Sequence, residues 1–300
     1  MKKVSIIIPT YNNLSYTKKC LKAIREKTKK DLYEMIVVDN ASTDGTQSFL
    51  KDQKDITYIL NKQNNNFSGA CNQGAHIAKN EVLLFLNNDT EVHDNWLIPI
   101  INVLKKEKMI GAVGAKLLFP NGTIQHAGVA IFDSKVPEHI YRLSPANKKY
   151  VNKKRTFQAV SAACIAIPKK VFDLVGGFDE YYKNGYEDMD LCLKIGKAGY
   201  KIIYEPKSVV THHESISLDR HRYTIRNLDL FISRWWETLS DANIYFKEDG
   251  FNRLQIFFFN IKYMAYVPDK YGTVPNNILK FRKIYLKWIK VILFFKKIKR

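Results

Sequence analysis

The segment Val82-Leu83-Leu84-Phe85-Leu86-Asn87-Asn88-Asp89 gives the clearest indication of the fold class of this chain. Five apolar residues in a row that end in a polar cluster are typical of a strand buried on both faces of a parallel sheet. The runs Val4–Pro9, Met35–Asp39 and Ile56–Leu60 have the same apolar character. Segments with helical spacing lie between these runs, at Leu14–Lys27, Thr46–Lys54 and Gly69–Lys79. The alternation predicts an α/β fold with a parallel central sheet and helices on both of its faces.

The polar residues after Pro9, Val38 and Leu86 each follow a predicted strand. Because the carboxyl ends of parallel strands meet at one edge of the sheet, we expect these polar residues to converge there. Ligands of open α/β sheets bind beyond this edge. The pattern therefore predicts a site of nucleotide size.

The chain has 300 residues, 46% of them hydrophobic, and a net charge of +19. Such a charge favours polyanionic partners, which include nucleic acid, anionic lipid and phosphate-bearing substrates. The four cysteines are far apart and form no Cys-x-x-Cys pair, so we expect buried free thiols and a cytoplasmic location. The sequence has no apolar run of about 18 residues, so we expect no membrane-spanning helix.

From Gly111 onward strand-like segments replace the regular alternation. They lie at Ala112–Phe119, Thr123–Phe132 and Gln158–Ile167, followed by a helix from about Glu187 and strands near Ile202 and Val209. We expect one domain over residues 1–240, with a nucleotide-binding half at 1–110 and an acceptor and catalytic half at 111–240. Residues 241–300 are expected to form a helical C-terminal extension.

Several motif-like segments follow one another in a fixed order. They are Val4–Asn12, Val37–Thr46, Phe67–Gly74, Phe85–Thr90, Gly176–Glu180, Gly185–Cys192 and His212–Ser215. This ordered set resembles the bacterial family 2 glycosyltransferases, in particular the rhamnosyltransferase-like branch that assembles surface polysaccharide. The resemblance implies a GT-A fold with a Rossmann-like, mostly parallel sheet. It also implies an inverting enzyme that moves a sugar from a nucleotide diphosphate donor to a glycan acceptor in O-antigen, capsule or lipooligosaccharide synthesis. The strand-end carboxylate Asp39 leads us to expect a UDP- or dTDP-sugar as that donor.

Asp39 ends a predicted strand, where its carboxylate is able to accept a hydrogen bond from a nucleobase N–H. Uracil, thymine and guanine offer such a donor, whereas cytosine presents a bare nitrogen. The alternative is that Asp39 only caps the turn that follows it. The resemblance implies donor-binding roles for a set of residues along this edge, namely Pro9, Thr10, Tyr11, Asp39, Asn72 and Asn88.

Asn87-Asn88-Asp89 stands where the family carries its Asp-x-Asp motif, so Asn87 replaces the first acid. The resemblance implies that Asp89 holds a divalent cation, manganese or magnesium, which stabilises the leaving diphosphate. It implies His212 as a second ligand, although the adjacent His213 leaves that choice open. The alternatives are a turn-capping role for Asp89 and a hydrogen-bonded His212 without metal.

Glu187-Asp188 begins a predicted helix, where backbone N–H groups favour ionised carboxylates. The resemblance implies that Asp188 is the base that removes the proton of the acceptor hydroxyl, and Glu187 is expected to orient acceptor hydroxyls. The alternative is that both are ordinary acids of a helix N-terminus. His126 and His139 also lie where relatives of this branch carry histidines, and the sequence assigns them no role.

Three other classes of protein are alternatives to a glycosyltransferase on the basis of the sequence. A sugar nucleotidyltransferase would have a glycine-rich loop after the first strand, but Pro9-Thr10-Tyr11-Asn12-Asn13 has no glycine. A basic nucleic-acid-binding protein fits the net charge, but acidic loops are expected where a phosphate backbone would lie, so we expect no nucleic acid partner. An inactive scaffold of a membrane glycan-assembly complex is the third alternative, and Asn87 keeps it open.

Residues 276–300 have the pattern of a basic amphipathic helix. Nine bases lie between Lys280 and Arg300, and no acid follows Asp269. Apolar residues step by three and four, at Ile278, Phe281, Tyr285, Trp288, Ile292 and Phe295. We expect this tail to bind the anionic inner face of the cell membrane, where a lipid-linked acceptor would lie. The alternative is a helix packed on the protein's own core.

Overall fold

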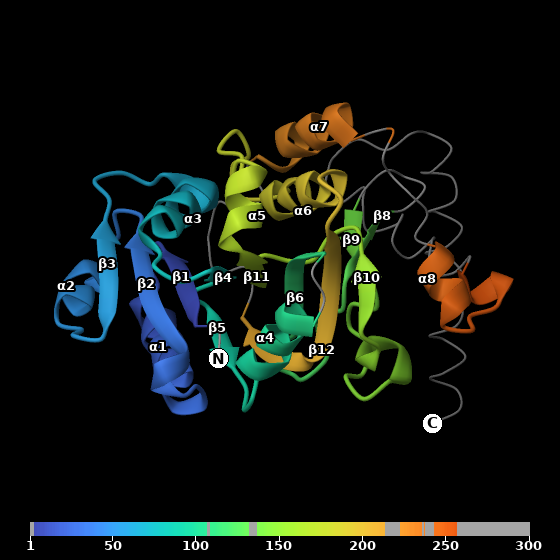
Figure 1. Cartoon of the computed structure of the whole chain (residues 1–300), viewed down its shortest axis with the longest axis horizontal. Helices are drawn as coiled ribbons and strands as arrows, with labels where there is room; N and C mark the ends of the chain where they lie inside the picture. Colours follow the sequence, from blue (N-terminus) through green and yellow to red (C-terminus); the bar gives the residue numbers. More distant parts are fainter. Residues whose placement is uncertain are drawn as a thin grey trace, which may run out of the picture. The chain divides into compact units, whose positions relative to one another are not determined.

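The computed structural model describes residues 3–106, 109–131, 137–213, 223–235, 237 and 243–256 (Figure 1). The chain forms two compact units. The larger unit combines Met1–Ala130 with His139–Tyr223, and the smaller combines Ile131–Glu138 with Thr224–Arg300. All residues predicted to act in donor binding, metal binding or catalysis belong to the larger unit.

A single mixed sheet forms the centre of the larger unit. Its strand order is β10 (Arg155–Phe157), β12 (Lys201–His212), β6 (Ile110–Leu118), β11 (Cys164–Pro168), β4 (Val82–Leu86), β1 (Val4–Thr10), β2 (Tyr33–Asp39) and β3 (Ile56–Leu60). The half from β4 to β3 is parallel, as predicted, and β12 runs parallel to β6. Strand β11 is antiparallel to both of its neighbours, so the carboxyl ends of β4 and β12 still lie at the same edge. The predicted α/β class with a mostly parallel central sheet is therefore confirmed.

Helices cover both faces of this sheet (Figure 1). Helices α1 (Leu14–Lys27) and α4 (Leu97–Lys106) share a buried apolar cluster with Ile6 and Ile8 of β1. Helix α3 (Asn66–Ile77) covers the opposite face, because a Cβ on its Gly74 would lie 2.5 Å from Ile7 Cγ2. The close approach requires glycine at this position. The other helices of the larger unit are α2 (Thr46–Lys51), α5 (Lys169–Leu174) and α6 (Glu187–Lys197), with short 3₁₀ turns η1 (Lys30–Leu32) and η2 (Lys149–Asn152).

Several elements from β5 (Thr90–Val92) onward differ from the predicted ones. The strand predicted over Thr123–Phe132 is two strands, β7 (Ile124–His126) and β8 (Val129–Ile131), because the chain turns at Gly128 with φ 111°. A Cβ there would lie 2.3 Å from the Phe157 ring. The two strands predicted near Ile202 and Val209 are one strand, β12, with an irregularity between Glu205 and Val209. Helix α4 and the short strands β5 and β9 (Pro137–His139) were not predicted.

The four cysteines are buried free thiols, as predicted. Burial raises the pKa of the Cys20 thiol to about 12, so it stays protonated and inert at neutral pH. Within the described part of the chain, none of the helices has the length and apolar character to cross a membrane. Helix α7 (Thr224–Trp235) lies before the predicted C-terminal extension, 241–300, and helix α8 (Asn243–Glu248) lies within it. The predicted amphipathic tail, residues 276–300, lies outside the described residues.

Candidate functional site

The carboxyl ends of β1, β2 and β4 meet at one edge of the sheet. Thr10 pairs with Asp39 across β1 and β2. The amide Nδ2 of Asn88, which follows β4, donates to Thr10 Oγ1 at 3.1 Å and to Thr17 Oγ1 at 3.0 Å. Asn88 therefore ties the end of β4 to the end of β1 and to α1. Three of the predicted donor-binding residues, Thr10, Asp39 and Asn88, are brought together in this way.

Asp39 is wholly buried, and its two carboxylate oxygens differ in their surroundings. Oδ2 accepts hydrogen bonds from the Ser42 N–H at 2.9 Å and from Gln47 Nε2 at 2.8 Å. Oδ1 is buried and has no hydrogen-bond partner among the described residues. The turn-capping role is thus present on one oxygen, while the other is an acceptor that a ligand N–H would satisfy.

The other predicted donor-binding residues lie in three different settings. Pro9 is buried, whereas the Tyr11 side chain is 46% exposed. Asn72 lies on α3 with its amide against the loop that follows α5: Nδ2 donates to Phe178 O at 2.9 Å and to Glu180 Oε1 at 3.0 Å, and Oδ1 accepts the Phe178 N–H at 3.1 Å. Asn72 therefore fixes this loop beside the sheet edge.

Asp89 and His212 form a close side-chain pair. Strand β5 pairs with the end of β12, so that Thr90 lies opposite His212. His212 Nε2 is 3.1 Å from Asp89 Oδ1, and the two side chains are only 6% and 13% exposed. Asn87 Nδ2 is 3.2 Å from the same Nε2, and within the described part of the chain Asn87 Oδ1 is buried without a partner. We call Asp89 and His212 together the Asp89–His212 pair.

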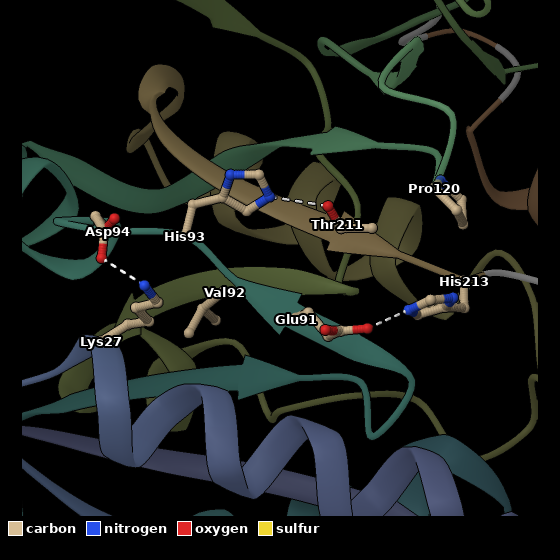
Figure 2. Close-up of a pocket in the computed structure, with 8 residues that line it drawn as sticks. All are labelled: Lys27, Glu91, Val92, His93, Asp94, Pro120, Thr211 and His213. Carbon is tan, nitrogen blue, oxygen red and sulfur yellow. Dashed lines mark hydrogen bonds and ion pairs between the residues drawn. The ribbon is translucent and has the colours of Figure 1, made fainter.

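His213 points away from this pair. Successive strand residues alternate between faces, so Thr211 and His213 lie on the side opposite to His212. Both line a hollow of about 370 Å³, shown in Figure 2, in which His213 Nε2 is 2.6 Å from Glu91 Oε1 and His93 Nε2 is 2.8 Å from Thr211 Oγ1. The hollow contains none of the predicted site residues. The geometry therefore distinguishes between the two adjacent histidines and joins Asp89 to His212.

The donor atoms of the Asp89–His212 pair fit a divalent cation. Neighbouring ligands on an octahedral cation with bonds of about 2.1 Å lie about 3.0 Å apart, and the observed separation is 3.1 Å. The described residues include no group of three or more His, Cys, Asp or Glu side chains that could enclose an ion. A cation held by this pair would take its remaining ligands from substrate phosphates and water, as Mg²⁺ commonly does.

Asp188 and Glu187 begin α6, as predicted, and both accept backbone hydrogen bonds. Asp188 Oδ2 accepts the Ala162 N–H at 3.0 Å and Oδ1 accepts the Met189 N–H at 2.9 Å. Glu187 accepts the N–H of Gly185. The preceding residues Asn184, Gly185 and Tyr186 all have positive φ, which defines the tight approach of the chain to the helix.

The short segment Ser161–Ala163 connects three parts of the site. The Asn87 N–H donates to Ala163 O at 3.1 Å, the Ala162 N–H donates to Asp188, and the Ser161 N–H donates to His126 Nε2 at 3.3 Å. The polar end of β4, the start of α6 and the buried His126 are therefore held by three consecutive residues. Sequence reasoning missed this segment, because small residues in an apolar run carry no chemical signal.

The buried His126 and the half-buried His139 form a cluster next to the Asp89–His212 pair. The ring centroids of His126 and His139 are 4.8 Å apart, and His139 Nδ1 is 3.3 Å from Gln125 O. Burial, together with the nearby His139 and His212, holds the pKa of His126 well below its usual range. His126 is therefore neutral at physiological pH. Gln125, which sequence reasoning also missed, contacts His212 directly through its side-chain amide.

Comparison with known proteins identifies the family of this chain. The sequence profile of Glycosyl transferase family 2 matches residues 5–173. The chain is 32% identical to the O-antigen biosynthesis protein RfbC of Myxococcus xanthus, over 77% of this chain and 19% of RfbC. It is 29% identical to the O-antigen chain rhamnosyltransferase RfbN of Salmonella typhimurium, over 75% of this chain and 68% of RfbN. The chain thus spans about a fifth of the length of RfbC.

A third relative is the N-acetylglucosaminyl-diphospho-decaprenol L-rhamnosyltransferase of Mycobacterium tuberculosis, 22% identical over 77% of this chain and 85% of that protein. In fold, the chain is similar to the crystal structure of GalNAc-T7 with UDP, GalNAc and Mn²⁺, with a TM-score of 0.64 and 18% identity, over 94% of this chain and 54% of that chain. This likeness agrees with the expected GT-A type of fold. The profile covers more than half of the sequence, and the chain belongs to glycosyl transferase family 2.

Proposed function

We propose that the protein transfers a sugar, with inversion at the anomeric carbon, from a UDP- or dTDP-sugar to a glycan acceptor of bacterial surface polysaccharide. The observation that carries the proposal is the Asp89–His212 pair at the carboxyl edge of the sheet, with Asp188 tied to the same edge through Ser161–Ala163. A cation site beside a positioned carboxylate is the combination that transfer from a diphosphate donor requires.

Asp39 is the proposed contact to the nucleobase. Its Oδ1 is a buried acceptor without a partner among the residues described, and the N3–H of uracil or thymine would satisfy it. The bare N3 of cytosine would instead leave two acceptors facing each other. Thr10, Asn88, Pro9 and Tyr11 are the proposed surroundings of the nucleoside.

The Asp89–His212 pair is the proposed holder of the divalent cation, manganese or magnesium. When bound, the cation neutralises charge on the leaving diphosphate. GalNAc-T7, which shares the fold, was crystallised with UDP and Mn²⁺. Asn87 stands in place of the first acid of the family's Asp-x-Asp motif, so the site offers one carboxylate where that motif has two.

Asp188 is the proposed base. The two backbone N–H groups that it accepts hold the carboxylate in one orientation and favour its ionised form. An ionised carboxylate has about four acceptor positions in all, and the proposed role uses one of them to accept the proton of an acceptor hydroxyl. The hydroxyl oxygen then attacks the anomeric carbon from the face opposite the diphosphate, which inverts the configuration. Glu187 is the proposed orienting group for acceptor hydroxyls.

The proposed acceptor is a lipid-linked glycan at the inner face of the cell membrane. The relative from M. tuberculosis acts on a decaprenol-linked sugar, and the basic pattern of residues 276–300 suits an anionic surface. An inactive scaffold remains the alternative, because Asn87 departs from the family motif.

Thermal unfolding of the full chain with UDP, dTDP, GDP and CDP, each with and without Mn²⁺, tests the donor class. A bound ligand raises the melting temperature by mass action. We expect UDP or dTDP with Mn²⁺ to give the largest shift, and the matching nucleotide sugar to be consumed when a lipid-linked acceptor is added. NMR of the product reports the anomeric configuration. Nucleotide binding without turnover on any lipid-linked acceptor would favour the scaffold, and absence of nucleotide binding would refute both.

A further inference from the structure

Gln125 makes two hydrogen bonds to a single residue, His212. Gln125 lies in β7, is only 1% exposed, and reaches the end of β12 with its side-chain amide. Its Oε1 is 2.7 Å from His212 Nδ1, and its Nε2 donates to His212 O at 3.2 Å. The amide therefore spans the ring and the backbone of the same histidine.

These two contacts together define the orientation of the amide and the tautomer of the ring. The backbone carbonyl of His212 can only accept, so the NH₂ group of Gln125 must face it. The carbonyl oxygen of Gln125 then faces His212 Nδ1, and because that oxygen can only accept, Nδ1 must carry a proton. In the neutral ring the lone pair is consequently on Nε2, the atom that lies 3.1 Å from Asp89 Oδ1.

We propose that Gln125 is a positioning residue that holds His212 in the Nδ1–H tautomer and so presents Nε2 to the cation held with Asp89. The inference rests on the proposed function of the Asp89–His212 pair. Histidine ligands commonly donate their second ring N–H to a neighbouring acceptor, and loss of that acceptor lowers metal affinity about 10–100-fold. In this chain a neutral amide has that role, and its second hydrogen bond also fixes the backbone of the ligand.

The neighbouring strands support a rigid placement of Gln125. Its backbone carbonyl lies 3.3 Å from His139 Nδ1, and the adjacent His126 accepts the Ser161 N–H. Gln125 thereby joins the cluster of His126 and His139 to the Asp89–His212 pair. His126 and His139 therefore have a structural role and take no direct part in the reaction.

Gln125→Met tests the inference, because methionine has a similar length and volume but offers neither hydrogen bond. We expect Mn²⁺ affinity, measured by titration calorimetry in the presence of UDP, to fall about 10–100-fold. UDP binding without Mn²⁺ should stay unchanged. The control is Gln53→Met, which removes a half-buried glutamine that bonds Phe49 and Arg25 away from the pair; it should leave Mn²⁺ affinity unchanged.

The tautomer is measured independently of metal and of activity. In metal-free protein with ¹⁵N-labelled histidine, long-range ¹H–¹⁵N spectra should report a protonated Nδ1 for His212. Gln125→Met should lose that preference. If Gln125→Met does not fold, Gln125→Glu is measured in its place. Glutamate keeps the acceptor for Nδ1, so this variant should keep the tautomer of His212, and loss of the tautomer would contradict the inference.

The outcomes separate the inference from the proposed function. If the wild-type protein binds Mn²⁺ but His212 is in the Nε2–H tautomer, or Gln125→Met binds Mn²⁺ as tightly as wild type, Gln125 does not position the ligand and the proposed transfer is untouched. If the wild-type protein binds no Mn²⁺ with any nucleotide, the cation site itself is wrong, and the inference falls with it.

Discussion

Asp188→Asn tests the proposed base with almost no change in side-chain shape. In the wild-type protein the two carboxylate oxygens accept the N–H groups of Ala162 and Met189 at 3.0 and 2.9 Å. Asparagine keeps one acceptor oxygen and turns an NH₂ group toward the other N–H. The resulting unsatisfied donor costs about 1–3 kcal/mol, and loss of the negative charge in the first turn of α6 costs about 0.3–1 kcal/mol.

This loss of stability is too small to remove activity by unfolding. A domain is typically stable by about 5–15 kcal/mol, so most of the variant stays folded, and its melting temperature falls by about 2–4 °C per kcal/mol. Loss of a general base lowers the rate at least about 100-fold, which corresponds to about 2.7 kcal/mol of transition-state stabilisation. Turnover per folded molecule must therefore fall far more than the folded fraction.

The assay measures sugar transfer, UDP binding and the melting temperature for wild type, Asp188→Asn and a matched control. Asp190→Asn is that control, because Asp190 lies in the same turn, accepts the Tyr182 hydroxyl at 3.3 Å and pairs with Lys194. We expect both variants to bind UDP and only Asp188→Asn to lose transfer. Turnover above about a tenth of wild type in Asp188→Asn, a loss below the expected range, would remove Asp188 from the role of base.

Four further predictions concern other parts of the chain. Asp39→Ala should weaken UDP binding measured by calorimetry, because the buried acceptor is lost; equal affinity of wild type for CDP and UDP would contradict the nucleobase contact. Asp89→Ala should abolish both turnover and the Mn²⁺-dependent rise in melting temperature, and full wild-type activity in excess chelator would disprove the metal role. The pKa of His126 is lower in the folded protein than its usual 6.5, so the unfolded chain binds that proton more readily. Stability measured by urea unfolding should therefore be full above about pH 6.5 and fall as the pH decreases below it, and His126→Gln should reduce this dependence, whereas an unchanged slope would assign it to other groups. Truncation after Pro275 should abolish co-sedimentation with anionic liposomes while the protein stays folded; unchanged co-sedimentation would show that the tail is not the anchor.

Local patterns predict the first half of the fold well. Helix α1 and strands β3 and β4 begin and end at the predicted residues, because helical spacing and short apolar runs determine these elements almost alone. Helix α4 has ten residues, Leu97–Lys106, that the sequence analysis assigned to no element. At the break, Gly128 has a positive φ and leaves no room for a Cβ beside the Phe157 ring, a contact that no local pattern contains.

The candidate site is less accessible to local reasoning. The expectation that Asp89 and His212 meet came from a family resemblance, since the two are far apart in sequence. They are joined by the pairing of β5 with β12 and by the His213 N–H, which donates to Asp89 O at 3.0 Å. Gln125 was missed for a similar reason. A glutamine inside Ile124-Gln125-His126-Ala127 has no chemical signature, and its role depends on a hydrogen bond to a residue 87 positions later.

The pairing of β5 with β12 also bears on how this site is able to diversify. The distance between the two side chains is set by three backbone pairs, from Val92 with Val210 to Thr90 with His212. The length of the chain between the two strands does not enter that distance. Loops in this stretch other than Ser161–Ala163 are therefore able to lengthen, shorten or change composition during evolution while the pair stays intact. A slip of the pairing by one residue would instead turn His212 to the opposite face and remove it from Asp89. Selection for new acceptors would thus change the loops and leave the pairing of β5 with β12 unchanged.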